Sequence, residues 1–159
     1  MGNSSSAHIY YGFNLGFNDE SDIILPWIDD NDDDIEKWWR KENNYVNPFE
    51  LYEDNGYTLR SEYQNPTKEQ YKQYFDHQKT FDVTFQISTY YFGHHEYPGT
   101  VIALKMPTVS STDYECDTFD PGILVISDYK KQLLMDFVKK YIPDHEFGEP
   151  SWLLCSNYG

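Results

Sequence analysis

The sequence predicts a single compact α+β domain, with a mainly antiparallel sheet of about five strands and about three helices packed on it. Three observations favour this class. The chain has 159 residues, enough for one sizeable hydrophobic core. Its residues are 39% hydrophobic and 18% aromatic, whereas acidic disordered proteins contain few aromatic side chains. Segments of alternating apolar residues are interleaved with segments of helical spacing. We expect residues 1–7 to form a flexible leader and residues 8–159 to form the domain.

Alternation over residues 8–17 predicts a half-buried first strand, because successive side chains of a strand point to opposite faces. Gly12 and Gly16 share one of these faces, which indicates a bulge or a close approach of another backbone. The apolar segment 23–28 follows. It fits a short edge strand, since Pro26 would interrupt the ladder of a central one.

An acidic stretch opens the first predicted helix, which is capped by Asp32 or Asp33 and runs to about Glu42. Carboxylates are favourable at the positive N-terminus of a helix. Glu36 and Arg40 lie one turn apart, a spacing that favours an ion pair. Three apolar side chains share one helical face and are expected in the core: Ile35, Trp38 and Trp39.

The following segments predict a hairpin and a second helix. Residues 51–52 and 57–59 flank a typical turn sequence at residues 54–56. The helix begins at Thr67, which has capping-box spacing with Gln70. The expected buried stripe of this helix contains Tyr71, Tyr74, Phe75 and Gln78.

The second half of the chain has one helical segment between strand segments. Residues 81–91 carry the strongest strand pattern, and residues 100–106 are expected to return antiparallel to them. Residues 122–126 predict a buried strand, after which Ser127 caps a third helix. Residues 152–155 predict a last, well-buried strand. The third helix has four apolar side chains on one face: Leu134, Phe137, Val138 and Tyr141.

The net charge of −15, from 27 acidic and 12 basic side chains, disfavours nucleic acid and anionic membranes as direct partners. It favours a basic protein. The charge is uneven: residues 1–65 have 14 acidic and 4 basic side chains, residues 66–112 have 4 of each, and residues 113–159 have 9 and 4. The first third is therefore the expected interaction face.

The sequence also bears on the location of the protein. Cys116 and Cys155 are the only cysteines, too few for a disulfide framework, and no apolar run suggests a membrane span or signal peptide. We expect a cytoplasmic protein with reduced thiols. The alternative is a peripheral membrane protein, because residues 1–6 fit the N-myristoylation pattern of eukaryotic cells.

The acidic stretch does not have the pattern of a calcium loop. Counted from Asp30, position 6 is Ile35 instead of glycine and position 12 is Lys41 instead of glutamate. Counted from Asp29, position 12 is Arg40. We expect no metal and no cofactor.

Catalytic patterns are also weak. Carboxylates on both sides of Cys116 disfavour the thiolate that a nucleophile needs. His94 and His95 are adjacent in a predicted turn, where their side chains diverge. Residues 143–146, Pro-Asp-His-Glu, resemble the start of a nuclease motif, but the lysine that should follow is missing. We expect no enzyme; a small hydrolase with a carboxylate or histidine site in residues 90–99 or 107–121 is the alternative.

The candidate site is the acidic stretch together with nearby acidic and aromatic residues. Five aspartates occupy residues 29–34, and such a density of carboxylates can compete with the phosphates of duplex DNA for a basic groove. Aromatic neighbours would supply the buried anchors of an interface. The expected partner-binding residues are Asp29, Asp30, Asp32, Asp33, Asp34, Glu36, Glu50, Glu53 and Asp54, with Trp27 and Tyr52.

These residues suggest a non-enzymatic acidic protein that blocks a basic partner. The natural target is a nucleic-acid-handling enzyme or a toxic nuclease, and inhibitors of this kind occur in viruses and in toxin–immunity pairs. DNA mimics share only composition with this chain. Besides the hydrolase, a second alternative is an acidic structural or accessory protein whose carboxylates serve solubility.

Overall fold

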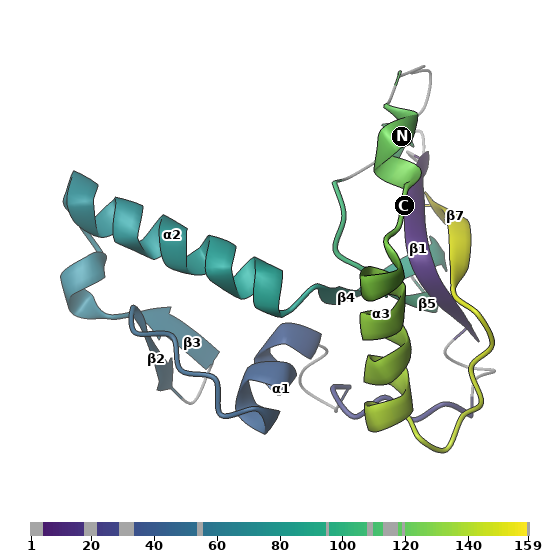
Figure 1. The fold of residues 1–159 in the computed structure, drawn as a ribbon, viewed down its shortest axis with the longest axis horizontal. Helices are drawn as coiled ribbons and strands as arrows, with labels where there is room; N and C mark the ends of the chain where they lie inside the picture. The colour runs from purple at the N-terminus through teal and green to yellow at the C-terminus, as the bar shows by residue number, and fades with distance from the viewer. Residues whose placement is uncertain are drawn as a thin grey trace. The chain divides into compact units, whose positions relative to one another are not determined.

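The computed structural model describes residues 5–17, 22–28, 34–53, 56–94, 96–107, 110–112, 118 and 120–158. These residues form three α-helices and seven strands (Figure 1), which confirms the α+β class. The chain divides into two compact units. The sheet unit contains Met1–Pro26 and Ile87–Gly159, and the inserted unit contains Trp27–Gln86. The extent of the domain predicted over residues 8–159 stays a prediction.

The sheet unit contains a five-stranded sheet. Its strands are β1 (Ser5–Phe17), β4 (Ile87–His94), β5 (Tyr97–Leu104), β6 (Ser110–Thr112) and β7 (Ser151–Tyr158). Every pairing is antiparallel, as predicted, except that of β4 with β7, which is parallel and makes the sheet mixed. β1 begins at Ser5, three residues earlier than expected.

Strand β1 is the centre of this sheet. Gly12 pairs with Ala103 of β5 and with Ser151 of β7, so the two strands lie on opposite edges of β1. β4 pairs with both β5 and β7, and the pairings therefore close a ring through β1, β5, β4 and β7. The pairing with β5 shifts register between Asn14 and Phe17, which confirms the irregularity predicted from Gly16.

Both faces of β5 are covered. Residues 101–104 are all buried, whereas a sheet with one solvated face would bury every second residue. Helix α3 (Asp128–Tyr141) lies against β5 and buries Leu134, Phe137 and Val138, as its pattern predicted. The other face is closed by a cluster inside the ring, which contains Val101, Ala103 and Cys155 with Tyr10, Tyr90, Phe92 and Leu153 around them.

The close approach of β1 to β5 in this ring requires a glycine at position 12. A Cβ atom at this position would collide with the carbonyl oxygen of Ile102 and lie 2.6 Å from the Cα of Ala103. Any other residue would therefore displace the β5 backbone. The close approach expected at this glycine is confirmed.

The inserted unit contains α1 (Ile35–Glu42), β2 (Glu50–Glu53), β3 (Gly56–Leu59), a 3-10 turn (Ser61–Tyr63) and α2 (Lys68–Thr84). The predicted hairpin is confirmed, with β2 antiparallel to β3. The predicted capping box is also confirmed: Thr67 Oγ1 accepts from the Gln70 amide at 3.3 Å, and Gln70 Oε1 accepts from the Thr67 amide at 2.9 Å.

The strand predicted over residues 81–91 is wrong in its first part, because α2 continues to Thr84 and β4 begins at Ile87. Phe81 and Phe85 are both buried. A spacing of four places two side chains on one face of a helix and also on one face of a strand, so the alternating pattern fits both. Val83, which the strand pattern put inside, is 69% exposed. Tyr71 and Phe75 of the predicted helix stripe are exposed as well.

Three other strand predictions need correction. The strand predicted over residues 122–126 is wrong, because a 3-10 turn occupies Pro121–Leu124, with Asp120 as its cap and Pro121 at its first position. Residues 23–28 are not a strand. β7 exists but is only half-buried, since it places Cys155 inside and leaves Leu154 76% exposed. Alternation along a strand with one covered face explains this result.

Candidate partner-binding surface

The described part of the acidic stretch begins with Asp34, the N-cap of α1. Its Oδ1 accepts from the amides of Glu36 at 2.9 Å and Lys37 at 3.0 Å. The prediction that Asp32 or Asp33 caps the helix is therefore wrong, because the helix starts after the aspartate run. Five members of the predicted site lie outside the described residues: Asp29, Asp30, Asp32, Asp33 and Asp54. The side chains of Tyr52 and Glu53 are not described either.

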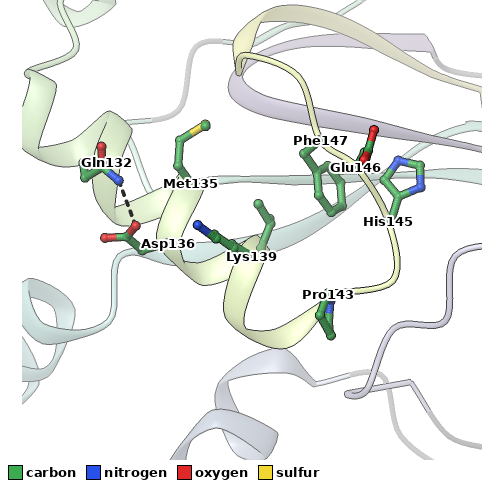
Figure 2. A pocket seen from close by; sticks show the side chains of 9 residues that line it. Gln132, Met135, Asp136, Lys139, Pro143, His145, Glu146 and Phe147 are labelled. Atoms are coloured by element: carbon green, nitrogen blue, oxygen red, sulfur yellow. Dashed lines mark hydrogen bonds between the residues drawn. The ribbon is translucent and has the colours of Figure 1, made fainter.

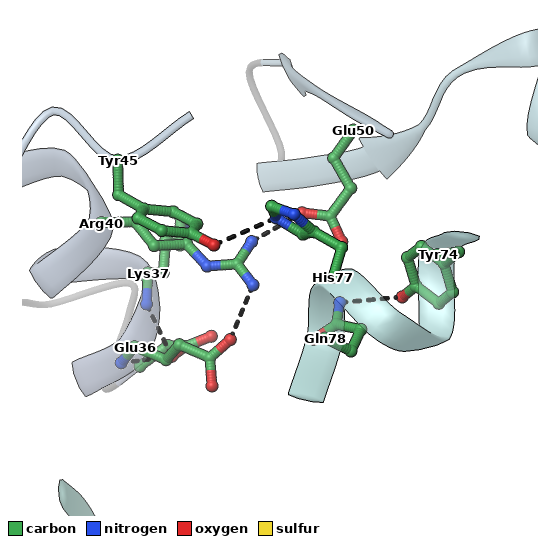
Figure 3. A network of polar contacts seen from close by, with 9 residues as sticks. Glu36, Lys37, Arg40, Tyr45, Glu50, Tyr74, His77 and Gln78 are labelled. Atoms are coloured by element: carbon green, nitrogen blue, oxygen red, sulfur yellow. Dashed lines mark hydrogen bonds and ion pairs between the residues drawn. The ribbon is translucent and has the colours of Figure 1, made fainter. Parts of the chain in front are cut away.

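Glu36 and Glu50 are joined by Arg40, whose side chain is buried (Figure 3). Arg40 Nη2 donates to Glu36 Oε1 at 2.8 Å, which is the ion pair predicted from their spacing. Arg40 Nη1 donates to Glu50 Oε2 at 2.6 Å. Two carboxylates around one guanidinium leave a net charge of −1 on the group. Glu50 therefore links β2 to α1, and both acids present less free charge than their sequence suggests.

Aromatic rings enclose the guanidinium of Arg40. It lies 4.5 Å from the ring centroid of Phe81 and 5.9 Å from that of Tyr45. Tyr45 Oη is hydrogen bonded to Nε2 of His77 in α2 at 3.0 Å. Burial raises the pKa of the Tyr45 phenol, and Arg40 offsets part of this rise. This network connects α1, β2 and α2 through side chains.

The tryptophans around α1 form a core. Trp27 is 3% exposed, and its ring centroid lies 5.5 Å from that of Trp38. Trp39 stacks on Phe85 with centroids 4.6 Å apart and meets Phe81 edge-on. Trp38 and Trp39 are partly buried, in line with the predicted stripe. Trp27 therefore stabilises the fold of the free protein, whatever it contributes to a partner.

The structure describes some of the residues that were considered for catalysis or metal binding. Among the described residues, no group of three or more His, Cys, Asp or Glu side chains is placed to hold a metal ion. His94 lies at the predicted hairpin, where its Nδ1 accepts from the Glu96 amide at 3.2 Å. Burial raises the pKa of the Cys155 thiol, which disfavours a thiolate nucleophile. Cys116, His95 and most of residues 107–121 lie outside the described ranges.

Two cavities at the end of α3 were not anticipated from the sequence. One has a volume of about 440 Å³ and is lined by α3 together with Pro143, His145, Glu146 and Phe147 (Figure 2). The other, about 370 Å³, is lined by residues 22–26 and 141–145. The only sequence signal near them is the Pro-Asp-His-Glu motif of residues 143–146, since nothing local reveals that residues 22–26 approach it.

Comparisons with known proteins add no functional assignment. No protein-family model matches the chain, and no curated protein or solved structure is significantly similar to it. In the part of the chain that the structure describes, none of the helices combines the length and apolar character needed to span a membrane.

Proposed function

We propose that this chain is a non-enzymatic acidic protein that binds and blocks a basic protein partner in the cytoplasm. The observation that carries the proposal is the attachment of the aspartate run, residues 29–34, to a helix held in place from several sides. Asp34 ends the run as the cap of α1, and Arg40 ties the last turn of α1 to β2. The run is therefore joined directly to an ordered body.

The charge of the protein supports a basic partner. The inserted unit has 14 acidic and 7 basic side chains, and the whole chain has a net charge of −15. A negative field of this size accelerates encounter with a basic surface and repels polyanions. A partner whose groove normally binds nucleic acid has the matching charge. Such partners include the nucleic-acid-handling enzymes and toxic nucleases targeted by viral inhibitors and immunity proteins.

The test is to replace the five aspartates of residues 29–34 by asparagine. Asparagine caps a helix as well as aspartate, so position 34 keeps its hydrogen bonds to α1. The partner would first be captured from the native host with the parent protein. We expect the variant to associate with it at least ten-fold more slowly at low salt, and to lose most of the salt dependence of association.

A second variant controls for net charge. It removes five exposed acids elsewhere: Glu62, Glu69, Asp76, Asp82 and Glu96, replaced by their amides. This variant should associate at a rate close to that of the parent. Equal association rates for the two variants at low ionic strength would contradict the proposed role of the run and would favour an acidic accessory protein.

A further inference from the structure

The smaller cavity combines carboxylates with apolar walls. It has a volume of about 370 Å³, within the range of roughly 300–1,000 Å³ typical of small-molecule sites. Residues 22–26 form one side, and the end of α3 with the segment that follows forms the other. Ile142 in its wall is buried, whereas Ile24 is 86% exposed. An isoleucine so exposed beside a cavity offers apolar surface to an occupant.

The charges of the lining are complementary to a cation. Asp22 and Asp144 both line the cavity, and its lining contains His145 but neither lysine nor arginine. An occupant with an apolar stem and a cationic end would place the stem on the isoleucines and the cation near the carboxylates. Lysine and arginine side chains both have this form.

Arginine fits this lining better than lysine. Its planar guanidinium can donate to two carboxylates at once and is less strongly hydrated than an ammonium group. Tyr141 in the wall supplies an aromatic ring, and the ammonium of Lys140 lies 4.6 Å from the centroid of this ring. This ammonium competes with an occupant for the ring, but Lys140 does not line the cavity.

We propose that this cavity receives an arginine side chain of the basic partner, with its guanidinium between Asp22 and Asp144. The inference rests on the proposed function and adds a second contact with the same partner. In the sequence, only two residues separate the lining segment 22–26 from the aspartate run that begins at Asp29. Arginine is also the charged residue most enriched among the energetically dominant residues of interfaces.

The neighbouring cavity supplies the contrast. This larger cavity shares Pro143 and His145 with the smaller one, but Lys139 also lines it (Figure 2). The ammonium of Lys139 would repel a guanidinium. The carboxylate of Asp136 in this cavity accepts from Gln132 Nε2 at 2.8 Å. The acids of the larger cavity are therefore matched controls for those of the smaller cavity.

The experiment uses two probes of nearly equal shape, N-acetyl-arginine amide and its neutral analogue N-acetyl-citrulline amide. Each is titrated into the full-length ¹⁵N-labelled protein, and amide shifts are followed by NMR. Exposed ion pairs are individually weak, so we expect the arginine probe to bind with a dissociation constant on the order of millimolar. Its shifts should centre on residues 22–26 and 141–145. The citrulline probe should bind at least ten-fold more weakly.

Variants then identify the carboxylates. The double variant Asp22→Asn/Asp144→Asn should bind the arginine probe at least five-fold more weakly than the parent. The control Asp136→Asn/Glu146→Gln removes the same charge from the other cavity and should stay within two-fold of the parent. Dispersed ¹⁵N spectra check that both variants remain folded.

Equal binding of the arginine and citrulline probes, or unchanged arginine binding by the Asp22/Asp144 variant, would overturn the proposal. Neither measurement requires the partner. Failure of the probe experiment would therefore leave the proposed function to the separate test on the aspartate run, and failure of that test would leave the affinity of the cavity for arginine intact.

Discussion

The guanidinium of Arg40 donates to the carboxylate of Glu50 at 2.6 Å, which joins the last turn of α1 to the first residue of β2. Both side chains are largely shielded from solvent. A buried ion pair does not by itself make a fold stable, but the loss of one partner leaves the other charge buried without compensation. We therefore expect replacement of Glu50 to affect the stability of the fold more than it affects partner binding.

Replacement of Glu50 by glutamine should lower the free energy of unfolding by about 2 kcal/mol, because Arg40 would retain only Glu36 as a charged partner. Urea denaturation measures this loss. The matched control is Glu36→Gln, which removes the more exposed carboxylate and should cost less than about 1 kcal/mol. Equal losses for the two variants would show that burial of the Glu50 pair has no special weight.

Phe81 should be the most sensitive position of α2. It is 1% exposed and contacts Trp39, Tyr45 and Phe85. Phe81→Ala should cost about 3–5 kcal/mol in urea denaturation, since a large cavity would remain. Phe75→Ala, on the same helix but 45% exposed, should cost less than about 1 kcal/mol. A larger loss of stability in Phe75→Ala than in Phe81→Ala would contradict the position of Phe81 in the core.

Gly12 should not tolerate alanine, because the new methyl group would collide with the backbone of β5 at Ile102 and Ala103. We expect a loss of about 2–3 kcal/mol, seen as a lower Tm. Gly148→Ala serves as the control, because its Cβ would meet no atom within 4 Å. That variant should be neutral or more stable by up to about 1 kcal/mol. Similar Tm values for the two variants would place β5 further from Gly12.

Tyr10 should make the protein sensitive to alkali. Burial, together with Tyr90 and Cys155, raises the pKa of Tyr10 from 10.0 to about 12. Between these two pH values the folded protein holds a proton that the unfolded chain has lost. The free energy of unfolding is therefore unaffected by this group below pH 10 and falls as the pH rises towards 12.

The size of this fall should be about 1–2 kcal/mol, since the phenol is only partly buried. Urea denaturation at a series of pH values measures it. Tyr10→Phe should remove this part of the pH dependence, whereas the exposed control Tyr129→Phe should retain it. An unchanged slope in the Tyr10 variant would assign the alkaline loss to other groups.

Local patterns predicted the elements that depend on local interactions. The capping box at Thr67 and the apolar stripe of α3 were both correct, because hydrogen bonds and helical spacing within a few residues determine them. The strand predicted at Phe81 was wrong because its spacing from Phe85 suits a helix equally well. Only the packing of both rings against Trp39 distinguishes the two.

In the candidate site, too, the local contacts were predicted and the tertiary contacts were not. The Glu36–Arg40 pair followed from helical spacing, but the second partner, Glu50, comes from a different element and had no local signal. Trp27 was expected as a partner contact, yet it is buried against Trp38. Its burial depends on a tertiary contact. The sequence thus indicated which charged and aromatic residues belong to the candidate site, and the fold determined how far their side chains remain exposed.

The closed ring of strands has a consequence for synthesis of the protein on the ribosome. β1 is made early, but its partners β5 and β7 come from residues 97–104 and 151–158. The inserted unit, by contrast, is one continuous stretch, so its contacts can form as soon as it emerges. Until β7 arrives, β1 has an unpaired edge rich in tyrosine and phenylalanine. The nascent chain should therefore depend on chaperones until β7 has been made.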